Sequence, residues 1–230
     1  MERKEAIHSA YRLTGGNSFY DGMITCSTLS GKAVCRLVWD MNREECDAYL
    51  EKALSGIPDH FSGRLLEVPV GTGILTMPAY RTLPDADITC LDYSEDMMGQ
   101  AQEKANRLAL KNVTFQQGEV GALPYETGTF DIVLSLNGFH AFPDKEAAYR
   151  EIFRVLKPGG TFCGCFYVEG EHKRTDWFVR HVYEKSGFFT PPYETAASLK
   201  KRLERMYADV TFGTEKGIAW FVCKGGRCEI

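Results

Sequence analysis

The sequence predicts an α/β fold with a doubly wound, mostly parallel sheet of seven strands that ends in an antiparallel hairpin. Three observations favour this fold. Apolar runs typical of buried strands alternate with amphipathic helical segments, which is the pattern of parallel sheets. A glycine-rich turn at Gly71 and Gly73 follows the first of these runs. The last two strands, expected at 210–213 and 218–224, are joined by only four residues, too few for a parallel crossover.

Each strand of this alternation can be placed from its apolar run, and each helix from its periodicity. The helix at 94–109 begins at Ser94, a favourable N-cap, and carries Glu95 and Asp96 in its first turn. The helix at 144–156 ends before Pro158, which cannot continue it. The expected strands lie at 64–70, 87–92, 113–117, 130–136 and 161–167, and the expected helices at 75–82, 94–109 and 144–156.

Two segments lie outside this alternation. Residues 1–60 contain helical and loop patterns rich in aromatic side chains, with Asn42 as a candidate N-cap, and we expect them to form a helical cap. We expect the remaining residues, 61–230, to form one domain. About forty residues separate the fifth and sixth strands, more than one crossover helix needs, so we expect a lid insertion near 168–195.

Composition argues against several classes of function. The chain has 230 residues, of which 44% are hydrophobic, enough for one sizeable core. Its net charge of −4 gives no electrostatic footprint for nucleic acid. No apolar run is long enough to span a membrane, and the N-terminus leads into no apolar signal segment. We expect a cytoplasmic protein, a monomer or homodimer, with neither a membrane span nor a nucleic-acid partner.

The eight cysteines are expected to be reduced thiols. Several fall inside expected strands, where cysteine behaves as a small buried hydrophobic residue. Cys163 and Cys165 point to one face of a strand, and Cys223 and Cys228 have no histidine nearby. A zinc or arsenic site made from these four is the weaker alternative, so no metal site is expected.

The apolar run at 65–70 and the turn after it point to a nucleoside cofactor. Because Gly71 and Gly73 carry no Cβ, backbone N–H groups and a helix N-terminus can approach a ligand closely. Glu67 places a negative charge at the same point, which suits the cationic amino-acid end of S-adenosylmethionine. A dinucleotide site needs a third glycine where Thr76 stands, so a nicotinamide oxidoreductase is a weaker alternative.

Five motifs lie in order at strand ends: 67–73, 91–94, 117–120 with 123–125, 130–133 and 156–160. With these motifs the sequence resembles the class I S-adenosylmethionine-dependent methyltransferases (methyltransferase type 11). Within them it is most similar to the group of the ubiquinone/menaquinone-biosynthesis methyltransferases. The resemblance implies a Rossmann-like fold, S-adenosylmethionine as cofactor, S-adenosylhomocysteine as product, and methyl transfer to a small-molecule acceptor.

The resemblance also implies roles for individual residues. Asp92 would accept hydrogen bonds from the ribose hydroxyls, and Glu119 and Val120 would meet the adenine. Tyr20 would close over the cofactor from the cap, and Asp131, at a strand start away from the ligand edge, would be structural. The full set expected to bind the cofactor is Tyr20, Glu67, Val68, Pro69, Gly71, Gly73, Asp92, Tyr93, Met97, Gly118, Glu119, Val120, Asn137 and Gly138.

Five of these residues have a structural alternative or depart from the family pattern. Asp92 could instead cap the helix that follows it, although Ser94 already suits that role. Glu67 could instead bond loop N–H groups, and Met97 could pack in the core on the apolar face of its helix. Glu119 stands where the family usually has Asp, and its alternative is a solvated loop acid. Pro69 stands where the family usually has Gly, and it removes a backbone donor where the methionine part of the cofactor should bind.

Methyl transfer from a sulfonium is an in-line displacement, which needs alignment and exclusion of water more than it needs a base. Where the acceptor must lose a proton, His140 is the expected base. The alternative for His140 is a loop histidine that only hydrogen-bonds the cofactor or the backbone. His172 and His181, in or beside the expected lid, are weaker candidates.

Aromatic residues gather in the cap, in the loop around His140 and in the lid, which suggests an apolar or aromatic acceptor. Alternatively, most of them only pack the lid onto the core. The methylated atom stays open, as does a non-catalytic module that binds S-adenosylmethionine or its product and regulates a partner. These aromatic residues are Phe19, Tyr20, Trp39, Phe139, Phe142, Trp177, Phe178, Phe188 and Phe189.

Overall fold

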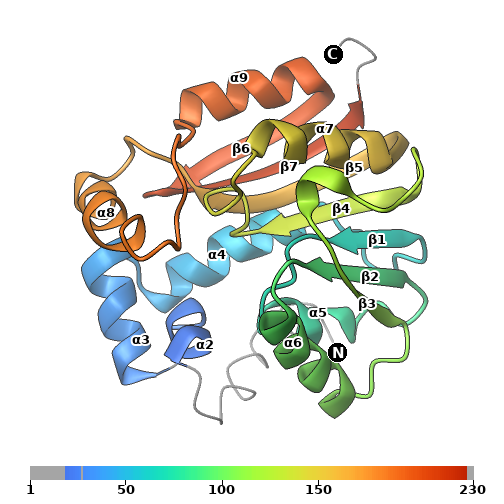
Figure 1. Cartoon of the computed structure of the whole chain (residues 1–230), viewed down its shortest axis with the longest axis horizontal. Helices are drawn as coiled ribbons and strands as arrows, with labels where there is room; N and C mark the ends of the chain where they lie inside the picture. The colour runs from blue at the N-terminus through green and yellow to red at the C-terminus, as the bar shows by residue number, and fades with distance from the viewer. Residues whose placement is uncertain (1–18, 27, 227–230) are drawn as a thin grey trace.

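The chain folds around one seven-stranded sheet (Figure 1). A computed structural model describes residues 19–26 and 28–226. The strand order is β3-β2-β1-β4-β5-β7-β6, in which β1 to β5 pair in parallel and β7 runs antiparallel to both neighbours. The predicted fold class, with its antiparallel C-terminal hairpin, is confirmed. The strands are β1 (Arg64–Glu67), β2 (Asp87–Asp92), β3 (Val113–Gln117), β4 (Phe130–Leu136), β5 (Leu156–Tyr167), β6 (Tyr207–Glu215) and β7 (Ile218–Gly226).

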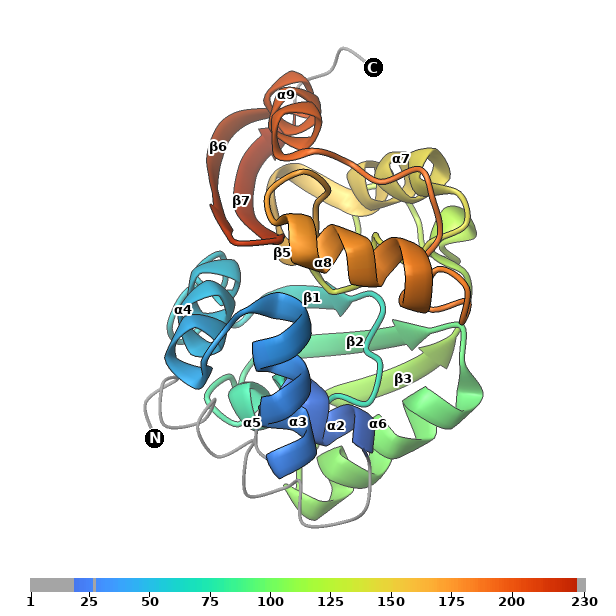
Figure 2. The ribbon, with the colours of Figure 1, turned by 90° about the vertical axis from the view of Figure 1, so that its left-hand side faces the viewer.

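Helices cover both faces of the sheet (Figure 2). Helices α4, α5 and α6 pack on one face, and α7 and α9 pack on the other. Within the described ranges, no helix combines the length and apolar character needed to cross a membrane. The helical segments are α2 (Phe19–Ile24), α3 (Leu29–Val34), η1 (Cys35–Trp39), α4 (Arg43–Leu54), α5 (Thr76–Tyr80), α6 (Glu95–Arg107), η2 (Val120–Ala122), α7 (Lys145–Val155), α8 (Lys173–Phe178), η3 (Val179–Tyr183) and α9 (Ala196–Met206).

The sheet separates two hydrophobic cores. Successive residues of a strand point to opposite faces, so neighbours along one strand enter different cores. Leu65 and Ile132 join the core with α4, α5 and α6, whereas Leu66 and Val133 join the core with α7 and α9. All four side chains are at most 3% exposed. Burial on both faces explains why the central strands read as continuous apolar runs.

Helix starts follow the local signals in the sequence. The Ser94 hydroxyl accepts a hydrogen bond from the Met97 N–H at 3.3 Å, and so caps α6. Asn42 and Glu45 form a capping box at the start of α4, with distances of 2.9 and 2.7 Å. Both predicted N-caps are therefore confirmed.

Four of the seven strands differ from the prediction at one or both ends. β6 spans Tyr207–Glu215 instead of 210–213, and β7 ends at Gly226 instead of residue 224, because the two strands pair beyond their apolar runs. β1 ends at Glu67 instead of residue 70, because Pro69 has no N–H to continue the sheet. β5 begins at Leu156 instead of residue 161, directly after α7. Leu156 pairs with Phe130, and the register then shifts before Ile132. This early pairing depends on a distant strand, so the local pattern does not reveal it.

The N-terminal helices and the segment at 168–195 contact each other (Figure 2). The Thr175 hydroxyl on α8 donates to the carbonyl of Val38 on η1 at 2.7 Å, and Arg174 pairs with Asp40 at 2.8 Å. The rings of Trp39 and Tyr183 lie stacked with their centroids 6.4 Å apart. The segments expected to act as cap and lid therefore touch, and their division into structural units stays a prediction.

Cys26 and Cys35 form a disulfide. The prediction that the thiols are all reduced is wrong for this pair. The physical reason is that the α2–α3 connection and the start of η1 fold against each other and bring the two sulfur atoms together. The thiols of Cys90, Cys165 and Cys223 are buried in the sheet, as expected for small hydrophobic residues.

The Asp131 carboxyl joins the starts of β1, β4 and β5. It accepts hydrogen bonds from the Arg64 N–H and from the Lys157 ammonium, each at 2.8 Å. Burial alone would raise the pKa of Asp131, but these hydrogen bonds outweigh it and lower the pKa. The residue lies at the strand end opposite the glycine turn.

We therefore expect Asp131→Asn to lower the free energy of unfolding by about 1 kcal/mol. The affinity for S-adenosylhomocysteine should stay unchanged. Urea denaturation measures the first effect and calorimetric titration the second. A loss of affinity without a loss of stability would show that Asp131 has a role in the ligand site.

Candidate active site

The carboxyl ends of β1 and β4 and the cap helix α2 enclose a cavity of about 70 Å³. A cavity of this size holds only part of a nucleoside cofactor, since pockets for whole ligands are several times larger. A larger, open depression between α9 and β6 lies away from these strand ends, at the edge of the sheet. The small cavity is lined by Ile24, Glu67, Pro69, Val70, Gly71, Thr72, Gly73, Ile74, Leu75, Thr76, Leu136 and Asn137.

The two glycines of the turn have different roles. Both adopt positive φ, +56° at Gly71 and +65° at Gly73, which side chains other than glycine rarely adopt. A Cβ at Gly71 would meet no atom within 4 Å, so this part of the turn leaves open space for a ligand. A Cβ at Gly73 would lie 2.9 Å from Met77 and Ala101, so this glycine lets α5 and α6 pack against the turn.

Asp92 holds the turn from the end of β2. Its carboxylate accepts hydrogen bonds from the Gly71 N–H at 2.7 Å and the Ser94 N–H at 2.8 Å. Burial raises its pKa, although these backbone hydrogen bonds act in the opposite direction. A carboxylate offers about four acceptor positions, so positions remain for the hydroxyl groups of a ligand.

Glu67 is buried at the base of the cavity. Its side chain accepts a hydrogen bond from the Tyr80 hydroxyl at 2.8 Å, and the Cys90 thiol lies 3.6 Å away. The residue is 1% exposed, and burial raises the pKa of its carboxyl to about 8. The group is therefore mostly protonated at neutral pH until a cation approaches it.

Thr76 presents a second polar group to the same cavity. Its hydroxyl lies close enough to the Glu67 carboxyl to lower the pKa of that group. No hydrogen bond of ordinary geometry satisfies the buried Thr76 oxygen in the described part of the chain. A buried polar atom without such a bond costs free energy, so a ligand with a donor or acceptor would be favoured here.

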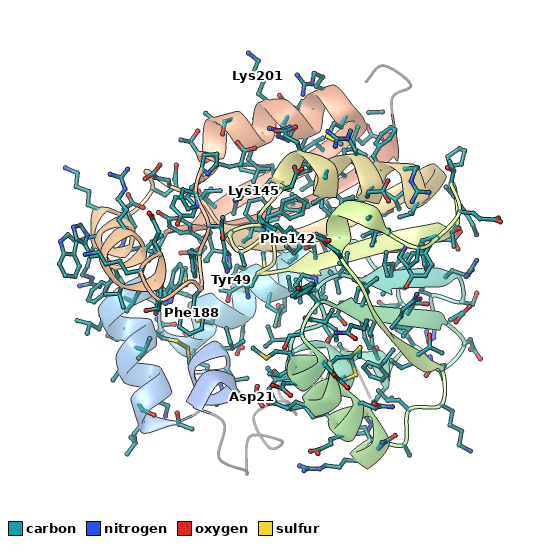
Figure 3. The ribbon with its side chains drawn as sticks, viewed as in Figure 1. Asp21, Tyr49, Phe142, Lys145, Phe188 and Lys201 are labelled. Carbon is teal, nitrogen blue, oxygen red and sulfur yellow. A yellow bond between two sulfur atoms is a disulfide. The ribbon has the colours of Figure 1, made fainter. Side chains whose placement is uncertain are left out.

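Asp21 links helix α2 to both helix α6 and the glycine turn, and the sequence analysis did not predict this. Asp21 on α2 pairs with Lys104 on α6 at 2.9 Å and accepts a hydrogen bond from the Thr72 hydroxyl at 2.5 Å (Figure 3). Both charged side chains are under 10% exposed. Lys104 lies beside Ala101 and Ala105 on the buried face of α6, and a lysine on an apolar face was the available signal.

His140 lies in the loop after β4. Its ring stacks on Phe189 with centroids 3.9 Å apart, and its Nδ1 lies 3.5 Å from the Tyr167 N–H. Burial, aided by the positive charge of Lys145, lowers the pKa of the imidazole to about 3. The ring is therefore neutral at physiological pH, able to accept a hydrogen bond but weak as a base.

The structure brings only part of the predicted cofactor set to the cavity. Asp92 contacts the cavity lining through Gly71. A Cβ at Gly138 would lie 2.4 Å from Pro69, so the loops after β1 and β4 touch there. Asn137 has a positive φ of +54°, an uncommon conformation often found at functional sites. The predicted residues that line the cavity are Glu67, Pro69, Gly71, Gly73 and Asn137.

The other predicted residues lie outside the cavity. Val68 and Val120 are buried in the core beneath α7 and α9, and Gly118 packs against Leu91. Tyr93 is 76% exposed. Glu119 is exposed and Met97 half-buried, so the adenine side of the expected site is open to solvent. Tyr20 belongs to α2, but its side chain lies outside the described part of the structure.

The aromatic residues lie in different environments. Trp177 and Phe188 are exposed. Phe142, labelled in Figure 3, and Phe139 are buried, and Phe139 packs on Tyr149 of α7 with centroids 4.3 Å apart, so these two belong to the core and not to the lid contact. Trp39, Tyr183, Phe189 and Tyr193 form a cluster with His140, where the cap meets the lid segment. The side chains of Phe19 and Tyr20 lie outside the described residues.

The two weaker candidates for a base, His172 and His181, have local roles. His172 caps α8 through Thr175, and its ring nitrogen lies 2.9 Å from the Thr175 hydroxyl. His181 stacks on the exposed Trp177. Neither residue lines the cavity.

Comparison with known proteins identifies the family. Residues 65–160 match a family model described as a methyltransferase domain. A demethylmenaquinone methyltransferase of Listeria welshimeri is 35% identical over 174 residues, which cover 65% of this chain and 73% of that protein. The chain belongs to the class I S-adenosylmethionine-dependent methyltransferases of the ubiquinone/menaquinone type.

Further relatives point to the same family. A demethylmenaquinone methyltransferase of Lactococcus lactis is 37% identical over 115 residues, 50% of this chain and 46% of that protein. The chain spans about half the length of several curated relatives that it matches. A crystal structure of a SAM-dependent methyltransferase from Aquifex aeolicus has a TM-score of 0.57 at 21% identity, covering 76% of this chain and 88% of that one. This likeness supports the fold.

The donor set of the cavity fits the family cofactor, S-adenosylmethionine. Glu67 offers a buried carboxyl, and it forms no ion pair with a basic side chain of the described residues. Gly71 offers open space, and Thr76 offers a hydroxyl with unused hydrogen-bonding capacity. These three groups match the ammonium and carboxylate at the amino-acid end of the cofactor.

We expect Glu67→Gln to change how the stability of the ligand-free protein depends on pH. Because the pKa of Glu67 is raised to about 8, its stabilising contribution is full below about pH 4.5 and is lost as pH rises through 8. The free energy of unfolding of the wild type should fall, relative to the variant, by on the order of 3 kcal/mol between about pH 5 and pH 8. Urea denaturation across that range measures the difference. A constant difference would contradict the burial of an ionisable carboxyl.

Proposed function

We propose that this chain transfers a methyl group from S-adenosylmethionine to a small apolar or aromatic acceptor by in-line displacement. The buried Glu67 carboxyl at the glycine turn is the observation that carries the proposal, because only a ligand with a cationic end relieves the cost of ionising it. The family membership of the chain supports the same reading. The cofactor supplies an electrophilic methyl group on a sulfonium.

In this proposal each part of the site holds one part of the cofactor. Glu67 accepts hydrogen bonds from the ammonium group, and the turn at Gly71 provides close backbone approach. Asp92 accepts hydrogen bonds from the ribose hydroxyls. Asn137 and Gly138 pass beside the methionine part. The adenine side would be formed by Tyr93, Met97, Gly118, Glu119 and Val120, and Tyr20 would close the site from the cap.

A quinone-type acceptor has the best support among small molecules. Relatives are named as demethylmenaquinone methyltransferases and as 2-methyl-6-phytyl-1,4-hydroquinone methyltransferases. In this chain, the cluster of Trp39, Tyr183, Phe189 and His140 offers planar surfaces next to the loop after β4.

The Nδ1 of the neutral His140 ring accepts the Tyr167 N–H, so its Nε2–H would donate a hydrogen bond to an oxygen of the acceptor and orient the aromatic ring that attacks the methyl group. This role needs no proton transfer to the imidazole, in keeping with its low pKa. A non-catalytic regulatory module is not favoured, because the named relatives are methyltransferases.

The test is transfer of a labelled methyl group from S-adenosylmethionine to benzo- and naphthohydroquinones, followed by mass spectrometry. We expect methylated product from the wild type. Asp92→Asn should lower kcat/KM about tenfold or more, because it loses a charged acceptor for the ribose hydroxyls. Asp131→Asn is the matched control, with the same change in charge at the opposite end of the strands.

Two results would overturn this proposal. One is an absence of methyl transfer to every hydroquinone and phenol tested while the wild type binds S-adenosylmethionine. The other is an equal loss of activity in folded Asp92→Asn and folded Asp131→Asn, which would contradict the role of Asp92 in holding the cofactor.

A further inference from the structure

Three cysteine side chains converge in the cap, away from the cavity lining. The sulfur atoms of Cys26, Cys35 and Cys46 all lie within 4.8 Å of one another. They come from the connection after α2, from the start of η1 and from α4. Cys26 and Cys35 are buried, and Cys46 is half-buried. Elsewhere in the described part of the chain, no other three such ligand atoms form a group.

The disulfide accounts for only two of the three sulfur atoms. Cys26 and Cys35 are bonded, and the Cys46 sulfur lies 3.5 Å from that of Cys26. Packing therefore places a third thiol in contact with the bonded pair. Three sulfur atoms at this spacing resemble a ligand set, since thiolates are the preferred ligands of zinc and other soft metal ions.

The cysteines of the sheet do not form a comparable group. Cys163 and Cys165 belong to the core beneath α4, α5 and α6, whereas Cys223 belongs to the core on the opposite face. The sheet thus separates three of the four residues that the sequence suggested as a weaker alternative for a zinc or arsenic site, and the fourth, Cys228, lies outside the described residues. The convergence in the cap joins three cysteines that the sequence analysis did not connect.

We propose that, once the disulfide is reduced, Cys26, Cys35 and Cys46 bind one thiophilic metal ion of the zinc type. A thiol or phosphine reductant supplies two electrons, and two protons from water complete the Cys26 and Cys35 thiols. A divalent ion then replaces three thiol protons and forms three metal–sulfur bonds. Tetrahedral bonds of about 2.3 Å place sulfur atoms about 3.8 Å apart, within the span of this cluster.

A metal ion at this site would affect how the N-terminal helices are held beside the glycine turn. Cys26 lies two residues after Ile24, which lines the cavity, and follows the helix that carries Asp21. A metal ion would link the end of α2 to η1 and α4. It would therefore hold the cap in place beside the glycine turn.

Zinc competition with a chromophoric chelator tests the proposal on the full chain without S-adenosylmethionine. The protein is reduced with a phosphine, and a count of eight thiols confirms complete reduction before zinc is added. We expect one zinc ion per chain. Affinity should fall about tenfold or more in Cys46→Ser and in Cys35→Ser, because each removes one thiolate. Cys223→Ala, on the far face of the sheet, should bind zinc like the wild type.

Cobalt binding to the wild type gives a readout that needs no variant. A thiolate-to-cobalt charge-transfer band with an intensity typical of three thiolates would support the site. No such band in the reduced protein, or equal zinc affinity in folded Cys46→Ser and the wild type, would overturn it. Because the measurement omits the cofactor, its failure would leave the proposed methyl transfer untouched.

Discussion

The burial of one carboxyl group at the end of β1 sets the main constraint on this molecule. Glu67 lies beneath the glycine turn, bonded to Tyr80 and almost fully shielded from water. Burial keeps it protonated until a positive charge arrives. A cationic ligand relieves the cost of ionisation, whereas a neutral or anionic ligand does not. In the proposed function, selectivity for an ammonium group would therefore follow from the burial of Glu67.

The turn above this carboxyl is held from two directions. Asp92 binds its backbone from the end of β2, and Asp21 binds Thr72 from the cap while pairing with Lys104. A buried ion pair is costly to desolvate, so its value here is better understood as fixing geometry than as stabilising the fold. Through these contacts the cap helix and the glycine turn share one arrangement. A shift of α2 would therefore move Thr72 and change the shape of the cavity at the glycine turn.

The sequence predicted the parts of this structure that depend on local patterns. The bounds of β2, β3 and β4 matched, because each is a short apolar run between clear breaks. The N-caps at Asn42 and Ser94 followed from side chains that bond nearby N–H groups. Asp92 was placed near the turn because parallel strands end at one edge of the sheet.

The features that the sequence did not predict depend on contacts between distant residues. Asp21 and Lys104 come from separate helices, and nothing near either residue indicates its partner. The low pKa of His140 results from burial against Phe189, which the lid segment supplies. The convergence of Cys26 and Cys46 likewise depends on how the cap helices pack. Local periodicity contains none of this information.

In the proposed function, the amino-acid end of S-adenosylmethionine ionises a buried, protonated Glu67. Calorimetric titration with S-adenosylmethionine at pH 7, in buffers of different ionisation enthalpy, tests it directly because it counts protons exchanged on binding. Because the pKa of Glu67 is about 8 before binding, we expect Glu67 to release close to one proton per chain, and the Glu67→Gln protein to release none from that position. Binding with no proton release, or identical release in both proteins, would contradict it.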